Sequence, residues 1–389
     1  MDEIFSHRLD WIGSDMRQNE QLLHPAVMTS SSERELSELF NEVRDISGVD
    51  WFDLIVPRRA DLIRLGIDSG RLERMERMAR LVADDDCFRL IRDDILKKTA
   101  ECDVKVSALA TYFPDVTSQN PQDRDTAVQA IANTVRIAVA LSQQKRKDDS
   151  PCMDFPIVEV VCGTIIDPGA EGPASEFRDV WDRDYKLDLL CQTLHQCIFD
   201  LRADPQIGAN SSFVLAVEME PGETYVLNSQ AAMLKLLDRI EGRSPVFDRD
   251  HKLLDHKLLE QHVGFNIDVA HMRIARIYAQ ELEPLQHRIA HAHISDHPLM
   301  HTHDQYVGSW TNPGFTQGGY REYLDLLLRR SHQFAEKKGF PFSNAVAVEL
   351  EGCNRIFWIH DSLTRLNHSL AIARRRYLPA AAAAGAPSA

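Results

Sequence analysis

The chain has 389 residues, of which 44% are hydrophobic, and its formal net charge is −15. This composition suffices for one large α/β core or two smaller ones, and an acidic chain is repelled by phosphate backbones, which disfavours general binding of nucleic acid. No apolar run approaches the ~20 residues that span a bilayer, and the first stretch, MDEIFSHRLDWIG, lacks the basic and apolar regions of a signal peptide. The seven cysteines are scattered and form no CxxC pair, as expected of reduced thiols in a cytoplasmic protein.

Short apolar runs rich in β-branched residues alternate with amphipathic stretches along the chain. Two early runs, near Phe5–Ile12 and Val49–Val56, are predicted as the first two strands. The later runs are continuous rather than alternating, which is typical of parallel strands covered by helices. They cover residues 104–113, 155–164, 212–220, 263–271, 289–297 and 345–352.

Helical patterns separate these runs. The clearest of them cover residues 125–144, 186–202, 229–242 and 321–339. Asn228 is the expected N-cap of the third, which ends at Gly242. The segment 54–103 is mostly helical and strongly charged, as expected of a solvated face. A repeated DHKLL within 243–262 indicates an inserted helix or loop.

Eight strand–helix units in a chain of this length predict a (β/α)₈ TIM barrel. A doubly wound open sheet is the structural alternative, but the chain has neither GxGxxG nor GxxxxGK[ST] to support it. We expect a single barrel domain over residues 1–376, with a helical N-terminal elaboration. The Ala-rich segment 377–389 is expected to be a disordered tail.

Four successive predicted strands carry acidic or imidazole side chains at their C-terminal ends. Such a group costs several kcal/mol in a buried strand unless it is paired or metal-bound, and the C-terminal ends of barrel strands are where active sites are built. Carboxylates with one or two imidazoles suit Mn²⁺, Mg²⁺, Co²⁺ or Zn²⁺, whereas the lack of thiolates argues against a closed structural zinc site. The residues are Glu218 and Glu220, Asp268 and His271, His291, His293 and Asp296, and Glu349 and Glu351.

Strand parity leaves the choice within three pairs open. Residues i and i+2 of a strand point to the same side, so both members of each pair can face the barrel axis. Glu220, Glu351 and His291 therefore remain alternatives to Glu218, Glu349 and His293.

Four motifs occur in order along residues 104–352. LAVEMEPG places a Glu before a Pro-containing turn, NIDVAHM contains Asp-x-x-His, AHISDH contains His-x-x-Asp, and AVAVELEG ends the last strand with a Glu. Together they resemble the xylose-isomerase-like barrels, which include sugar isomerases and epimerases and the nucleases of the endonuclease-IV type. Ser295 stands where the family often has Lys, and the stretch between His293 and Glu349 is long enough to predict an enlarged loop after strand seven.

The resemblance implies a ligand set and a reaction. One divalent ion, expected to be Mn²⁺ with Mg²⁺, Co²⁺ or Zn²⁺ as alternatives, would be held by Glu218, Asp268, His293 and Glu349. His271 would face the substrate. The chain would then be an isomerase or epimerase of a sugar or related polyol ketone, removing a proton beside the carbonyl through a metal-stabilised enediolate. In similar epimerases the two ligand glutamates act as acid and base, here Glu218 and Glu349.

Further substrate contacts are expected around this site. His271 would hold a hydroxyl or oxyanion, and His301 or His303 a more distant hydroxyl. Trp310 lies in the loop after strand seven, which is either an aromatic lid over the site or an ordinary surface loop. Glu159 either reaches the same mouth or forms a structural ion pair.

Two other classes of function remain open. The first is a metal-dependent lyase or hydrolase on the same barrel, either glycoside-cleaving or a nuclease of the endonuclease-IV type. The second is a barrel without catalytic activity that binds a ligand or partner protein. The expected partner is a carbohydrate-like small molecule rather than a membrane or nucleic acid, and assembly into a homo-oligomer is compatible with the sequence.

Overall fold

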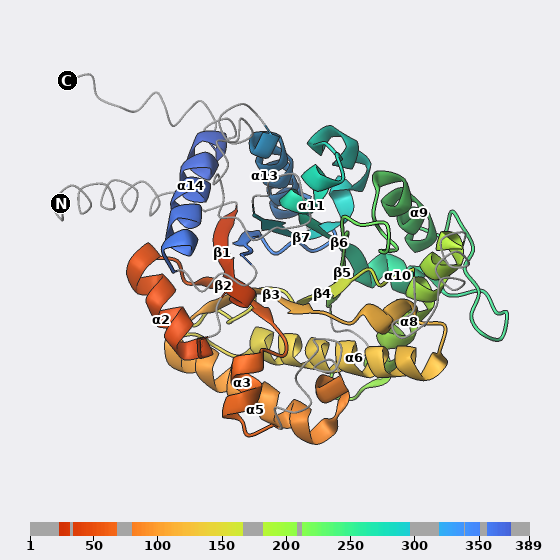
Figure 1. Ribbon diagram of the computed structural model, residues 1–389, viewed down its shortest axis with the longest axis horizontal. Helices are drawn as coiled ribbons and strands as arrows, with labels where there is room; N and C mark the ends of the chain where they lie inside the picture. Colours follow the sequence, from red (N-terminus) through yellow and green to blue (C-terminus); the bar gives the residue numbers. More distant parts are fainter. Residues whose placement is uncertain are drawn as a thin grey trace.

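Eight parallel strands close into a barrel in which each strand pairs with the next and the last returns to the first (Figure 1). The computed structural model describes residues 23–31, 34–67, 80–165, 182–207, 212–295, 319–337, 339–350 and 356–374. The strands are β1 (His24–Met28), β2 (Trp51–Ile55), β3 (Lys105–Thr111), β4 (Ile157–Val161), β5 (Val214–Glu218), β6 (Val263–Asp268), β7 (Ile289–Ile294) and β8 (Ala345–Val348). The predicted (β/α)₈ TIM barrel is confirmed.

Helices surround the barrel and bury their apolar faces against it (Figure 1). The α-helices are α2 (Leu36–Ser47), α3 (Arg59–Arg64), α5 (Asp85–Cys102), α6 (Pro121–Gln143), α8 (Arg183–Ala203), α9 (Gln230–Ile240), α10 (His256–His262), α11 (Val269–Ile274), α13 (Gly319–Lys337) and α14 (Ile356–Arg374). In the described part of the chain, the 3₁₀ helices are η1 (Thr29–Ser31), η3 (Pro114–Thr117) and η4 (Ala279–Arg288).

The first strand is not where the sequence predicted it. The run near Phe5–Ile12 lies outside the described residues, and β1 is formed instead by HPAVM, which pairs with β2 and β8. This run is short and contains Pro25, which cannot donate a ladder hydrogen bond, so it is a weak strand candidate by sequence. β2 to β8 all fall within or overlap their predicted runs.

Two local predictions are corrected or refined. The N-cap of α9 is Ser229 rather than Asn228, because the Ser229 side chain accepts a hydrogen bond from the backbone N–H of Ala232. The segment 243–262 is a loop with an antiparallel bridge between Phe247 and Leu253, followed by α10.

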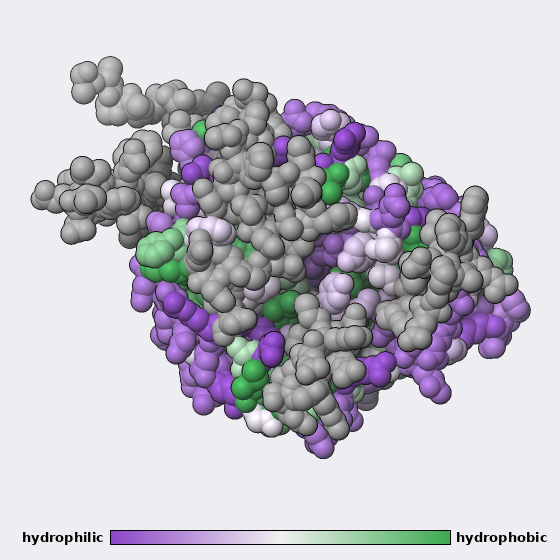
Figure 2. Space-filling model, in the orientation of Figure 1, coloured by the Kyte–Doolittle hydropathy of each residue, from purple (hydrophilic) through white to green (hydrophobic). Residues whose placement is uncertain are grey.

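The surface agrees with the acidic, polar composition. On the face shown in Figure 2, the described residues are mostly hydrophilic, and hydrophobic ones occupy small separate areas. Among the described helices, none combines the length and apolar character needed to cross a membrane.

The register of the sheet sets the depth of the polar strand ends. Val161 of β4 pairs with Glu218, and Asp268 pairs with His293. Glu349 directly follows β8, and its backbone N–H donates to the Ile294 carbonyl at 3.1 Å. The C-terminal ends of β5 to β8 therefore place four potential ligands at one end of the barrel.

Gly264 in β6 is expected to tolerate no larger side chain. A Cβ there would lie 2.5 Å from Cε1 of Phe340 and 2.6 Å from the carbonyl oxygen of Arg288. Because a backbone atom cannot move aside cheaply, Gly264→Ala should lower the free energy of unfolding by ~1–3 kcal/mol, measured by urea denaturation. Gly339→Ala is the matched control, because no heavy atom lies within 4 Å of a Cβ at that position. Equal stability of the two variants would contradict the prediction.

His24, at the start of β1, should make the fold acid-sensitive. Its ring stacks on Trp51 with centroids 4.3 Å apart, and burial, assisted by Arg374, lowers the pKa of His24 to about 4. The unfolded chain binds the proton near pH 6.5, so stability is present above that pH and is lost as pH falls towards 4, by at most about 3 kcal/mol.

The variant His24→Gln should therefore lose less stability than the wild type between these two pH values. Chemical denaturation at a series of pH values measures the difference. The same substitution at the exposed residue His368 is the control. If His24→Gln and wild type have parallel pH profiles, His24 is not the source of the acid sensitivity.

Candidate metal centre

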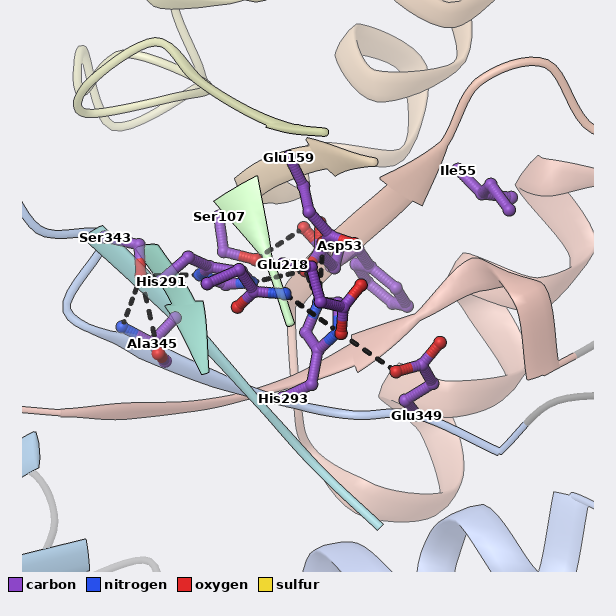
Figure 3. Close-up of polar contacts among 12 residues, drawn as sticks. Asp53, Ile55, Ser107, Glu159, Glu218, His291, His293, Ser343, Ala345 and Glu349 are labelled. Atoms are coloured by element: carbon purple, nitrogen blue, oxygen red, sulfur yellow. Dashed lines mark hydrogen bonds and ion pairs between the residues drawn. The ribbon is translucent and has the colours of Figure 1, made fainter. Parts of the chain in front are cut away.

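Four side chains from four neighbouring strand ends meet in one buried cluster. Glu218 is the last residue of β5, Asp268 the last of β6, His293 lies near the end of β7, and Glu349 follows β8. One potential ligand atom from each lies within 4.8 Å of those of the others, and all four residues are buried. These are the four residues that the family resemblance implies as metal ligands, and Figure 3 shows three of them, Glu218, His293 and Glu349, converging.

His293 lies at the centre of this cluster. Its Nδ1 atom is 3.0 Å from Glu349 Oε2 and 3.7 Å from Glu218 Oε1. Its Nε2 atom faces the other way, 2.9 Å from Asp53 Oδ2 and 3.1 Å from Glu159 Oε2 (Figure 3). The two ring nitrogens therefore face two different groups of carboxylates.

Asp53 was not predicted from the sequence. It lies in the middle of β2 with no exposed surface, and its Oδ2 atom is also 2.5 Å from His291 Nε2. The available signal was a carboxylate inside the apolar run WFDLIV, which is costly in a buried strand unless it is paired. Asn266 was also not predicted. It is a polar residue in the buried strand β6, and its Nδ2 atom lies 3.3 Å from His293 Nδ1.

The four-residue cluster and the buried residues next to it contain more negative charge than their two imidazoles can balance. The carboxylates are Asp53, Glu159, Glu218, Asp268 and Glu349, and the imidazoles are His291 and His293. Burial raises the pKa of Glu218 well above its usual value, and the neighbouring carboxylate of Glu159 raises it further. Burial also raises the pKa of Glu349 to about 8. Without a cation, the cluster must therefore hold extra protons.

The histidines respond to the same charges. Burial disfavours the imidazolium of His293, but the carboxylates of Glu159 and Glu349 outweigh this effect and raise the pKa of His293 well above its usual value. Asp53 shows the reverse, because its two imidazole partners outweigh burial and lower its pKa to about 2. The negative charge of the buried carboxylates therefore favours binding of a positive charge among them.

The donor set fits a divalent cation. Glu218 Oε1 and Glu349 Oε2 are buried and accept no hydrogen bond from the described residues, and such buried acceptors are costly unless a cation or donor faces them. Three carboxylates and one imidazole within 4.8 Å suit Mn²⁺, Mg²⁺, Co²⁺ or Zn²⁺.

Metal affinity should rise with pH. Below about pH 8 the Glu349 carboxyl of the metal-free chain holds a proton, and a ligand must be deprotonated to bind. Each unit of pH below that value should weaken binding up to about tenfold for each proton released. Calorimetric titration with Mn²⁺ in buffers of different ionisation enthalpy measures both the affinity and the protons released. An affinity that is constant from about pH 6 to 8 would contradict this account.

His271 lies beside the cluster, held by the helix that follows β6. The Asp268 Oδ1 atom caps α11 by accepting from the backbone N–H of His271 at 2.9 Å, which explains the Asp-x-x-His spacing. The His271 Nδ1 atom lies 3.1 Å from the carbonyl oxygen of Met219 and 3.5 Å from Glu218 Oε1. Glu220 Oε2 is 3.7 Å away, so Glu220 contacts His271 rather than the four-residue cluster.

The remaining predicted residues divide into two groups. Glu159 belongs to the buried cluster through His293, and His291 lies deeper than His293, bonded to Asp53 and to Ser343 Oγ at 2.8 Å. The other group lies outside the described residues and comprises Asp296, His301, His303, Trp310, Glu351 and the enlarged loop after strand seven.

Comparisons with known proteins support the fold. No protein-family model and no curated protein matches this sequence. A structure of L-ribulose 3-epimerase covers 94% of this chain and 99% of its own, with a TM-score of 0.54 and 14% sequence identity. A structure of D-psicose 3-epimerase, determined in the presence of D-fructose, covers 90% and 98% with a TM-score of 0.49 and 12% identity.

At these identities the likeness concerns the fold alone. The chain therefore shares the (β/α)₈ barrel fold of the L-ribulose 3-epimerase structure, the fold that its sequence predicts.

Proposed function

We propose that this chain is a divalent-metal-dependent isomerase or epimerase of a sugar or related polyol ketone. The observation that carries the proposal is the buried cluster of Glu218, Asp268, His293 and Glu349 at the C-terminal ends of β5 to β8. The same fold in a structure of L-ribulose 3-epimerase supports this reaction class. A proton beside a carbonyl is only weakly acidic, so its removal requires both a base and stabilisation of the developing charge.

A divalent ion held by these four residues would stabilise negative charge on the carbonyl and neighbouring hydroxyl oxygens of the substrate. Glu218 and Glu349 would move the proton through their carboxylates. They reach His293 Nδ1 from two different strands. Two carboxylates on separate strands can address two faces of one carbon, as inversion of a stereocentre requires. Burial raises the pKa of both carboxyls in the metal-free chain, and a bound cation would lower it again.

His271 is proposed to orient the substrate. Its Nδ1–H donates to the Met219 carbonyl, and the Nδ1 atom lies 3.5 Å from Glu218 Oε1, so the ring is fixed beside the proposed metal ligands, where a substrate hydroxyl would lie. His301, His303 and Trp310 stay predictions as contacts to the rest of the substrate. Glu159 is better supported as a partner of His293 than as a substrate contact, because its Oε2 atom is 3.1 Å from His293 Nε2 and its side chain is 4% exposed.

A two-metal hydrolase is the second candidate. Asp53, His291 and His293 form a second group of potential ligand atoms within 4.8 Å, and a pair of metal ions is typical of enzymes that cleave phosphate esters. Two tightly bound ions per chain would favour this alternative. One ion per chain favours the isomerase.

The test is exchange of substrate protons with solvent. The Mn²⁺-loaded protein is incubated in D₂O with a panel of ketopentoses and ketohexoses, the metal is removed, and loss of the proton beside the carbonyl is followed by ¹H NMR. We expect exchange, accompanied by a second epimer or isomer, with at least one ketose. A protein that binds one metal per chain but exchanges no proton in any ketose would contradict the proposal.

A further inference from the structure

One carboxylate oxygen in the barrel is shared by two histidines. Asp53 Oδ2 lies 2.5 Å from His291 Nε2 and 2.9 Å from His293 Nε2, and all three side chains have no exposed surface (Figure 3). We propose that Asp53 is a positioning residue that holds His293 as the Nε2–H tautomer, with the lone pair of Nδ1 directed at the metal site. The inference rests on the proposed function, because it concerns how that metal is held.

The hydrogen bonds indicate which nitrogen of each imidazole carries the proton. A carboxylate oxygen accepts, so both imidazoles that face Asp53 Oδ2 must donate from Nε2–H. A neutral imidazole then has its lone pair on Nδ1. For His291 this lone pair is satisfied, because Ser343 Oγ lies 2.8 Å away and donates to it.

For His293 the same lone pair faces other acceptors. Its Nδ1 atom is 3.0 Å from Glu349 Oε2 and 3.7 Å from Glu218 Oε1. The Asn266 side-chain amide, a hydrogen-bond donor, lies 3.3 Å from Nδ1. A lone pair that faces two carboxylates is repulsive unless a positive charge lies between them. In the metal-free chain a proton on Nδ1 supplies that charge, and a cation held by Glu218, Asp268 and Glu349 would take its place, with the Nε2–H tautomer then directing the Nδ1 lone pair at the cation.

The contacts of the Asp53 group have the lengths of hydrogen bonds. Asp53 Oδ2 lies 2.5 Å from His291 Nε2 and 2.9 Å from His293 Nε2, and the other nitrogen of His291 lies 2.8 Å from Ser343 Oγ. The Asp53 group therefore supports the metal ligand through hydrogen bonds, which is how carboxylates orient metal-bound imidazoles.

Two variants of Asp53 test the proposal. Co²⁺ is titrated into each protein and followed by its visible absorption, which reports affinity and ligand geometry without any need for activity. Asp53→Ala removes the acceptor and should weaken Co²⁺ binding ~10–100-fold. Asp53→Asn keeps an acceptor oxygen and should recover most of the affinity. Asp154→Asn, at a half-exposed carboxylate paired with Lys105, is the matched control and should bind as the wild type does.

A measurement on the wild type avoids dependence on how the variants fold. In ¹⁵N-histidine-labelled, Zn²⁺-loaded protein, two-bond ¹H–¹⁵N correlations should show both His291 and His293 protonated at Nε2, with the metal on Nδ1 of His293. Metal on Nε2 of His293, an imidazolium at His293, or two Zn²⁺ per chain would overturn the proposal. Unchanged Co²⁺ affinity in a folded Asp53→Ala variant would also overturn it.

These outcomes differ from those that test the function. Wild type that binds Co²⁺ with the expected tautomer but exchanges no ketose proton contradicts the proposed reaction and supports the role of Asp53. Wild type that exchanges ketose protons while Asp53→Ala keeps full Co²⁺ affinity contradicts the role of Asp53 alone. Wild type that binds no divalent metal overturns both.

Discussion

Replacing Asp268 by alanine should eliminate bound metal from the purified protein, whereas wild type should retain close to one ion per chain. Asp268 lies at the end of β6 with no exposed surface and belongs to the four-residue cluster, so its loss removes both a ligand and a negative charge. Elemental analysis of protein purified without added metal measures the difference. Asp268→Asn, which preserves the shape of the side chain but not its charge, should also fail to retain the ion.

Asp268→Ala has a second effect that needs its own control. The Asp268 side chain caps α11, and loss of a cap typically costs ~1 kcal/mol. Ser229→Ala removes the comparable cap of α9 without touching the cluster, so it should lose similar stability and keep its metal. Full metal content in a folded Asp268→Ala variant would show that the ion is held elsewhere.

Glu349→Gln or Glu218→Gln should lower the rate of net epimerisation ~10²–10⁴-fold, because an amide cannot take or return the proton. The two variants should differ in which epimer exchanges its proton with solvent. If each carboxylate serves one face of the reacting carbon, each variant still washes the proton out of one epimer into D₂O and not out of the other. Following both epimers separately by ¹H NMR therefore assigns each glutamate to its face.

Metal content must be measured alongside, because both glutamates are proposed ligands. Exchange is compared at saturating Mn²⁺. Glu220→Gln is the matched control: Glu220 follows β5, contacts His271, and lies outside the four-residue cluster, so it should retain activity within about tenfold. A larger loss for Glu220→Gln than for Glu218→Gln would show that the ligand in this pair has been assigned to the wrong residue.

The local chemistry of the strand ends was readable from the sequence because each signal lies within a few residues. Asp268 and His271 occur in one motif, and the structure explains their spacing by the cap that Asp268 provides. Glu218 ends an apolar run that forms a strand. In contrast, β1 was missed, because a five-residue run that contains Pro25 has little strand character by itself and is held in place by its neighbours β2 and β8.

Parity left Glu218 and Glu220 as equal candidates, the family resemblance favoured Glu218, and the folded chain shows how the two differ. Glu218 is paired within the sheet to Val161, whereas Glu220 lies in the following turn, where its backbone N–H donates to the Leu227 carbonyl. The sheet thus directs one carboxylate into the cluster, and the turn directs the other towards His271.

The sequence by itself predicted the barrel and the polar ends of its later strands, because periodicity and strand-end chemistry are local properties, and the family resemblance chose the four proposed ligands among those strand ends. Only the tertiary structure decided what surrounds them. Asp53 and His293 are 240 positions apart in the chain, and closure of the barrel brings β2 within hydrogen-bond distance of a side chain on β7. No pattern within either strand encodes that contact, because it depends on the register and curvature of the whole sheet.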